Sequence, residues 1–109
     1  MERRLFLLQR SSALVLAPLA LGHIAVMLIA VDGGLTGGEI LARTRGSFFW
    51  GAYYGLFVLA AAVHAPIGLR AVLREWTPWR GRDLDSAMVA LGLLLLGLGL
   101  RAVVAVVTP

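Results

Sequence analysis

Three long stretches of this sequence contain no Asp, Glu, Lys or Arg. They cover residues 11–31, 47–69 and 86–100, and the last continues beyond a single arginine as a further apolar run. A helix needs about 20 apolar residues to cross roughly 30 Å of hydrocarbon, and a helix satisfies its own backbone hydrogen bonds in lipid. Each stretch, together with its apolar flanks, is therefore long enough to cross a membrane.

We predict an all-α fold of three transmembrane helices that run up, down and up. The expected spans are about residues 5–31, 47–73 and 85–107, within a single integral membrane domain over residues 1–109. After the first span, a glycine-rich turn and a short surface helix over residues 39–45 are expected. The basic start of the chain precedes an apolar run that is too long for a signal peptide, which predicts a retained first span.

The composition limits what such a chain can do alone. Of its 109 residues 60% are hydrophobic, and three helices enclose little interior of their own. We therefore expect the chain to form part of a multi-subunit membrane helical bundle, packed against partner helices and lipid. All ten basic residues are arginines at or near the ends of apolar runs, which indicates membrane topology and not nucleic-acid binding. The absence of cysteine excludes disulfides and thiolate-bound iron–sulfur clusters in this chain.

The arginines also predict an orientation, because the side richer in Lys and Arg usually faces the cytoplasm. One side would carry the arginines of the amino terminus and of the second connection: Arg3, Arg4, Arg10, Arg70, Arg74, Arg80 and Arg82. The other side would carry fewer: Arg43, Arg45 and Arg101. We predict a multi-pass protein of the cell inner membrane with a cytoplasmic amino terminus.

Two histidines, His23 and His64, lie inside expected spans. An ionisable residue in a span is costly and suggests a functional role by default. The alternative is a neutral imidazole that hydrogen-bonds a neighbouring helix, and the residues alone leave both interpretations open. The uncharged stretches offer no carboxylate or thiolate for a proton relay, a zinc site or a di-iron site. Haem iron needs only one or two axial nitrogens, so it suits lone imidazoles best.

The depths of the two histidines differ. At about 1.5 Å per residue, His23 lies about 20 Å along its span from Arg10, whereas His64 lies about 9 Å before Arg70. They are poorly placed to hold one iron between them; if both bind haem iron, each would take its second ligand from another chain, giving two haems. Small residues nearby leave room for a porphyrin or for another helix. The glycines of the third span are interpreted as packing positions: Gly92, Gly97 and Gly99.

Two polar residues lie where the first span enters the membrane. Arg10 can hydrogen-bond a quinone carbonyl or a haem propionate, and Ser12 follows it closely. The alternative for Arg10 is ordinary contact with lipid headgroups. Trp76 and Trp79 are typical of interfacial anchors.

Two motifs resemble those of a known family. Residues 9–13 read Gln-Arg-Ser-Ser-Ala, and residues 64–71 read His-Ala-Pro-Ile-Gly-Leu-Arg-Ala. The chain resembles the small three-helix cytochrome b membrane anchors of succinate dehydrogenase and fumarate reductase. The corresponding family motifs are His-Arg-x-Ser-Gly and His-x-x-x-Gly-x-Arg-His. The chain departs from them at Gln9, Ala13 and Ala71.

The resemblance implies roles for individual residues. His64 matches the axial ligand of haem b, and His23 would be a second haem ligand, as in members that bind two haems. Arg10 and Arg70 would meet the haem propionates, and Arg10 and Ser12 would line the quinone site. In this interpretation one or two haems are shared with a partner subunit, and quinone is the substrate.

The resemblance also implies a function. The chain would anchor a flavoprotein subunit and an iron–sulfur subunit to the membrane, beside a second small membrane-anchor subunit that supplies the other axial histidine. Electrons would pass from the iron–sulfur clusters to quinone. The chain would then be an enzyme subunit of a succinate:quinone oxidoreductase without a complete active site of its own.

Two other classes of protein compete with this interpretation. A small multidrug-type transporter would need a fourth span and a buried acid on the first helix, and the sequence has neither. A haem-free structural anchor or assembly subunit of a respiratory complex would use both histidines for packing, and it remains the alternative.

Overall fold

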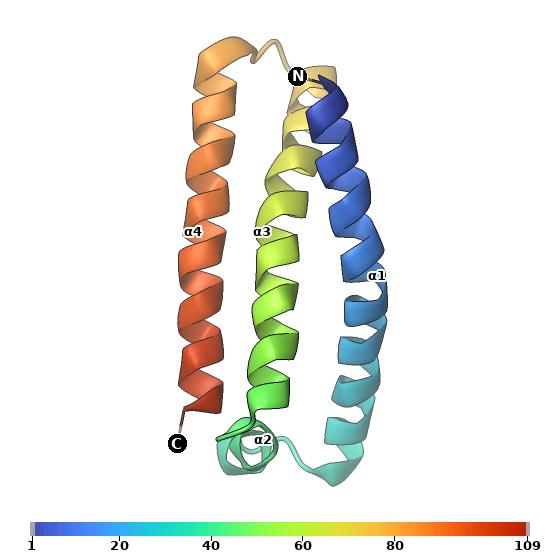
Figure 1. Cartoon of the computed structure of the whole chain (residues 1–109), viewed down its shortest axis with the longest axis vertical. Coiled ribbons are helices and arrows are strands. Elements are labelled where there is room, and N and C mark those ends of the chain that lie inside the picture. Colours follow the sequence, from blue (N-terminus) through green and yellow to red (C-terminus); the bar gives the residue numbers. More distant parts are fainter. Residues whose placement is uncertain (1, 109) are drawn as a thin grey trace.

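Residues 2–108, which the structure describes, form four helices and no strand. The structure is a computed structural model (Figure 1). The helices are α1 (Glu2–Gly33), α2 (Gly37–Thr44), α3 (Phe48–Trp76) and α4 (Gly81–Val107). The predicted all-α fold with three long apolar helices is confirmed, because α1, α3 and α4 are each long and apolar enough to cross a membrane. The expected surface helix after the first span is present as α2.

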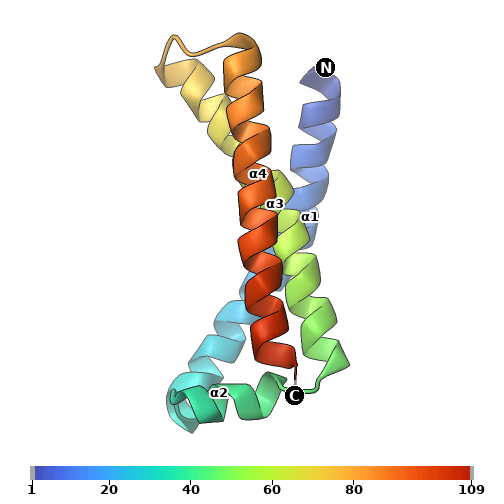
Figure 2. The same ribbon diagram turned by 90° about the vertical axis from the view of Figure 1, so that its left-hand side faces the viewer.

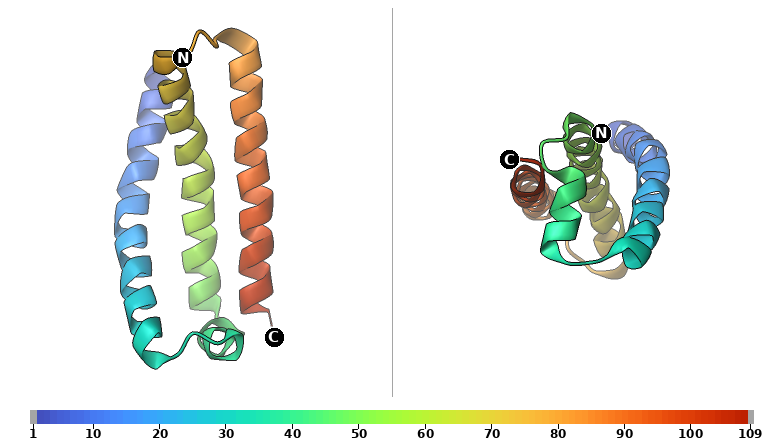
Figure 3. Two further views of the ribbon diagram at one scale, coloured as in Figure 1. Left: turned by 180° about the vertical axis from the view of Figure 1, so that it is seen from behind. Right: turned by 90° about the horizontal axis from the view of Figure 1, so that it is seen from below.

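The three long helices run antiparallel in chain order, and α3 lies between α1 and α4 (Figures 1 and 3). The bundle extends over 47 × 22 × 22 Å, with the short α2 lying across one end. Figure 2 shows the same arrangement from the α4 side, with α2 beneath the long helices. The amino-terminal end of α1 and the α3–α4 connection are therefore together at the end opposite α2.

The bundle has very little interior. Five apolar residues of the described chain are buried: Ala30, Ala60, Pro66, Leu84 and Met88. Many leucines, isoleucines and valines of the long helices point outward instead, with Leu14 at 72% exposure as one example. Such a surface is unfavourable in water but suits lipid or partner helices, as the composition predicted.

Close contacts between α3 and its neighbours use small residues. On α1, Gly22 leaves room for Tyr53 of α3, whose hydroxyl donates a hydrogen bond to the Leu19 carbonyl. On α4, a Cβ at Gly99 would lie 2.5 Å from Cγ1 of Val58. Without a hydrophobic driving force in lipid, close approach of this kind supplies much of the helix–helix attraction.

The glycines of α4 do not all pack in the same way. A Cβ at Gly92 would lie 3.2 Å from the Ala62 carbonyl oxygen, so Gly92 and Gly99 are packing positions as predicted. A Cβ at Gly97 would meet nothing within 4 Å among the residues that the structure describes. Only two of the three predicted packing glycines therefore touch another helix of this chain.

Helix α2 is tied to the carboxyl end of α4. Thr36 caps α2 by accepting a hydrogen bond from the Glu39 amide at 3.2 Å. At the other end, the Thr44 hydroxyl donates to the Val106 carbonyl at 2.6 Å, and the Gly46 amide donates to the Val107 carbonyl at 2.6 Å. Gly46 adopts φ +73°, a conformation that glycine reaches without strain. These bonds hold the first connection against the last helix.

The two glycines of α4 give a direct test of the packing. We expect Gly99→Ala to destabilise the protein by about 1–3 kcal/mol relative to Gly97→Ala, because Val58 must shift to admit the new methyl group. Both changes gain the same helix propensity, so the difference isolates the contact. Thermal unfolding of the detergent-solubilised complex measures it, and equal stability of the two variants would contradict the packing described for α3 and α4.

Candidate functional site

One polar contact between α1 and α3 joins Ser12 to His64. The Ser12 hydroxyl lies 3.2 Å from Nδ1 of His64 and donates a hydrogen bond to the Gln9 carbonyl at 3.0 Å. Ser12 is 7% exposed and His64 is half-buried. Two residues from separate sequence motifs therefore meet across the helix interface.

The geometry of Ser12 bears on the protonation of His64. A serine hydroxyl has one proton, and in the structure it points to the Gln9 carbonyl. The Ser12 oxygen can then only accept from His64, which requires the proton of a neutral imidazole to be on Nδ1. In that tautomer the other ring nitrogen, Nε2, keeps its lone pair and is the nitrogen that can ligate a metal ion.

Gln9 lies beside this pair. Its side-chain oxygen, Oε1, is buried and has no hydrogen-bond partner within the described part of the chain. Gly68 on α3 makes room for its amide, because a Cβ there would lie 3.1 Å from Nε2 of Gln9. Buried acceptors are rarely left without a donor in folded proteins. Gln9 can therefore accept a hydrogen bond from a group added at this position.

Arg10 does not join this cluster. Its side chain is exposed, and its guanidinium carbon lies 5.8 Å from the ring centroid of Phe6 on the outer surface of α1. Ser12 points inward to α3, so the two residues predicted to line a quinone site point in different directions. The structure brings Ser12 and His64 together and leaves Arg10 at the periphery.

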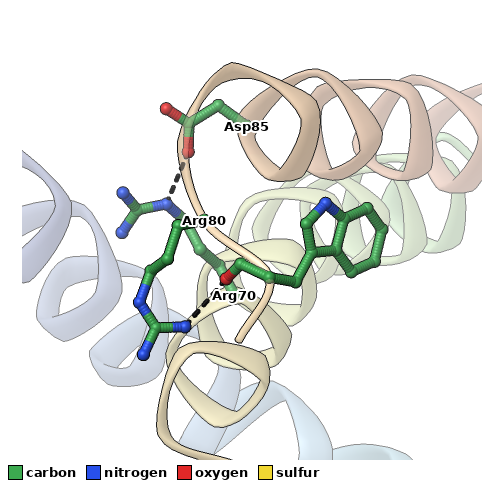
Figure 4. A network of polar contacts seen from close by, with 4 residues as sticks. Arg70, Arg80 and Asp85 are labelled. Carbon is green, nitrogen blue, oxygen red and sulfur yellow. Dashed lines mark hydrogen bonds and ion pairs between the residues drawn. The ribbon is translucent and has the colours of Figure 1, made fainter. Parts of the chain in front are cut away.

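Arg70 binds a residue that no sequence motif had paired with it. Its Nε donates to Oδ1 of Asp85 on α4 at 2.8 Å, and the side chains are 15% and 38% exposed (Figure 4). In the same connection Arg80 donates to the Thr77 and Trp79 carbonyls. Arg70 and Asp85 flank two uncharged stretches that are joined by a short connection. Both residues are therefore expected at the same depth in the membrane, and this was the feature of the sequence that could have predicted the pair.

His23 occupies a separate site near α2. Its Nδ1 lies 3.3 Å from the Tyr54 hydroxyl, and Tyr54 and Phe57 present their rings to it edge-on, each at 5.6 Å between centroids. Two cavities of about 320 and 370 Å³ border His23 and Tyr54, and both reach Ile40 and Thr44 of α2. From the sequence, Tyr54 was one of several aromatics at the start of the second span, and nothing there predicted this contact.

The two histidines are far apart along the bundle. His64 faces Ser12 and His23 faces Tyr54, and about 15 Å of helix axis separates Tyr54 from His64 at about 1.5 Å per residue. In the described chain, no three His, Cys, Asp or Glu side chains gather as a metal-binding cluster. Any metal bound at either histidine must therefore bring further ligands with it.

A comparison with protein-family models identifies the chain. The model described as "Succinate dehydrogenase/Fumarate reductase transmembrane subunit" matches residues 3–107, nearly the whole sequence. The chain belongs to this family. Comparisons with curated proteins and with solved structures each found no match.

Membership of the succinate dehydrogenase/fumarate reductase transmembrane subunit family confirms the resemblance carried by the two motifs. The chain is thus a subunit of a multi-subunit oxidoreductase complex. Together with the three apolar helices, membership also makes it a multi-pass membrane protein.

The Arg70–Asp85 contact predicts an energetic coupling between α3 and α4 in this transmembrane subunit. We expect a double-mutant cycle of Arg70→Gln and Asp85→Asn to give about 1 kcal/mol of coupling, since the bond is direct and Arg70 is sheltered. Denaturation of the solubilised complex measures the coupling. Asp83→Asn is the control partner, because Asp83 is exposed on the same helix, and its coupling to Arg70 should be near zero. A value near zero for Asp85 as well would refute the prediction.

Proposed function

We propose that this chain binds haem b through His64 and contributes to a quinone site, so that electrons pass from iron–sulfur clusters to quinone. One observation carries the proposal: Nδ1 of His64 faces the Ser12 hydroxyl, whose proton has the Gln9 carbonyl as acceptor, so in the neutral imidazole that donates to Ser12 the lone pair is on Nε2. Haem iron takes such a nitrogen as an axial ligand, so the donor chemistry fits. When bound, haem supplies one-electron transfer.

The surroundings of His64 support this assignment. Its neighbours on α3 are small, with Ala65 exposed and Ala61 and Gly68 half-buried. Small side chains permit the close approach of a flat macrocycle or of a partner helix. The buried, unpartnered Oε1 of Gln9 adds an acceptor for an O–H or N–H group at the same depth. The second axial histidine would come from the partner anchor subunit.

His23 is the second proposed haem ligand. Its contact with the Tyr54 hydroxyl, which can donate or accept, fits either tautomer of the imidazole. The adjacent cavities lie against α2, away from His64. A haem at His23 would therefore be a second one and would also need a ligand from a partner chain.

The arginines have proposed roles at the end opposite α2. Arg10 is exposed and can donate to a quinone carbonyl or a haem propionate. Arg70, whose Nε donates to Asp85, is proposed to meet a haem propionate through its positive charge. Ser12 is proposed beside the quinone, where its oxygen can accept a hydrogen bond from a quinol O–H. Its own proton is directed to Gln9, so it is not a donor to a quinone carbonyl.

The arginine-rich end sets the proposed orientation. The amino terminus and the α3–α4 connection share one end of the bundle and carry most of the arginines, which supports a cytoplasmic location for that end in the cell inner membrane. The flavoprotein and iron–sulfur subunits would bind there. The second small anchor subunit would cover part of the exposed apolar surface of the long helices, and lipid would cover the rest.

A haem-free structural anchor is the second candidate function. The contacts of His64 with Ser12 and of His23 with Tyr54 both join α1 to α3. Each imidazole can therefore stabilise the packing of these two helices without binding a cofactor. This alternative needs no cofactor, and the visible spectrum of the purified complex distinguishes it from the first.

The axial-ligand role of His64 has a spectroscopic test. We expect His64→Gly to abolish one b-type signal in reduced-minus-oxidised spectra, because the variant lacks the ligand nitrogen. Added imidazole should restore part of that signal by filling the space that the side chain leaves. The same treatment of Ala52→Gly, an exposed alanine near the other end of α3, is the control and should leave the spectrum intact. A wild-type spectrum for His64→Gly would rule out the ligand assignment.

The quinone role of Arg10 has a kinetic test. We expect Arg10→Ala to raise the KM for quinone about tenfold, since a charge-assisted hydrogen bond is worth about 1.5–3 kcal/mol. Steady-state reduction of a soluble quinone by the solubilised complex measures the effect. Arg4→Ala removes an exposed charge nearer the start of the same helix and should have little effect. Equal KM values for the two variants would exclude a specific role for Arg10.

A further inference from the structure

We propose that Ser12 is a positioning residue for His64: its hydroxyl holds the imidazole in the Nδ1–H form, aims Nε2 away from α1 and tunes the bound metal. The inference rests on the proposed function of His64 as a haem ligand. It gives Ser12 a role distinct from the quinone contact predicted from the sequence.

The hydroxyl itself is fixed by α1. Ser12 is 7% exposed and sits within the helix, where its proton goes to the Gln9 carbonyl one turn earlier at 3.0 Å. Backward hydrogen bonding of this kind is common for serine in helices. The Ser12 oxygen therefore offers its lone pairs to α3 from a rigid position and not from a freely rotating side chain.

The two tautomers of His64 are not equivalent in this setting. With the proton on Nδ1, the imidazole donates to Ser12 while Ser12 donates to Gln9, and both contacts are satisfied. With the proton on Nε2, a lone pair of Nδ1 faces the Ser12 oxygen at 3.2 Å. Ser12 must then give up the Gln9 carbonyl in order to donate to the ring. The structure therefore favours the tautomer whose Nε2 is free to bind iron.

The hydrogen bond also affects the electronic character of the ligand. A histidine that donates its second N–H to an acceptor becomes a more basic ligand and is held in one orientation. With haem bound, a more basic ligand would stabilise the oxidised, more positive iron, so the Ser12–His64 contact would lower the reduction potential. Removing the acceptor should raise that potential and loosen the haem.

Ser12→Ala in the assembled complex is the first variant to measure. We expect it to retain a b-type spectrum, but with about tenfold weaker haem retention, which is the lower range for loss of a partner of a metal ligand. Redox titration should show a higher midpoint potential for the same signal. Ser11→Ala is the matched control, because Ser11 is the exposed neighbour and its loss should change neither quantity.

Two variants of equal side-chain shape distinguish the effect of the hydroxyl's hydrogen bond from the effect of side-chain packing. Ser12→Thr keeps a hydroxyl, and Ser12→Val replaces it with a methyl group of similar size. We expect the Thr variant to keep the wild-type midpoint potential and the Val variant to behave like Ser12→Ala. This comparison tests the role of the hydroxyl even if Ser12→Ala assembles poorly, because the Thr and Val variants add the same bulk.

The outcomes separate this inference from the proposal on which it rests. If His64→Gly loses the b-type signal but Ser12→Ala and Ser12→Val keep the wild-type potential and retention, the positioning role is overturned and the ligand role stands. If His64→Gly keeps the full signal, the ligand role itself fails and the positioning role fails with it. A potential that rises equally in the Thr and Val variants would assign the effect to packing and overturn the hydroxyl's role.

Discussion

Apolar side chains gain nothing by leaving lipid for one another, so the three long helices depend on close contact and on a few polar bonds between them. Helix α3 provides both. Its small and branched residues fit against Gly92 and Gly99 of α4, and its polar groups bind α1 through Ser12 and the Leu19 carbonyl. The position of His64 follows from this packing, because the residue that contacts its Nδ1 belongs to the neighbouring helix.

Much of the fold follows from the sequence because a run without charge can hardly be anything but a helix in a membrane. The helices extend beyond the uncharged runs, since α1 begins at Glu2 and α3 continues to Trp76. Charged residues at such ends reach water without breaking the helix. The ends of the uncharged runs therefore indicate the boundaries of the hydrocarbon layer better than they indicate the ends of the helices.

The contacts between helices were harder to predict. The sequence placed Ser12 and His64 in separate motifs, and it offered no rule for the register that brings them within 3.2 Å. The same holds for His23 and Tyr54, whose meeting depends on how α1 rotates about its own axis. The Arg70–Asp85 pair was more accessible, because a short connection places its members at equal depth. A single sequence therefore predicts how deep a residue lies in the membrane far better than it predicts the direction in which its side chain points.

The bonds from the first connection to the end of α4 have a consequence for how that end lies in the membrane. The last carbonyls of a helix normally need water or headgroups as donors. Here the Thr44 hydroxyl and the Gly46 amide serve the carbonyls of Val106 and Val107, and the final turn of α4 carries no basic side chain. This end of α4 can therefore stop below the lipid phosphates without leaving these two carbonyls unpaired in hydrocarbon.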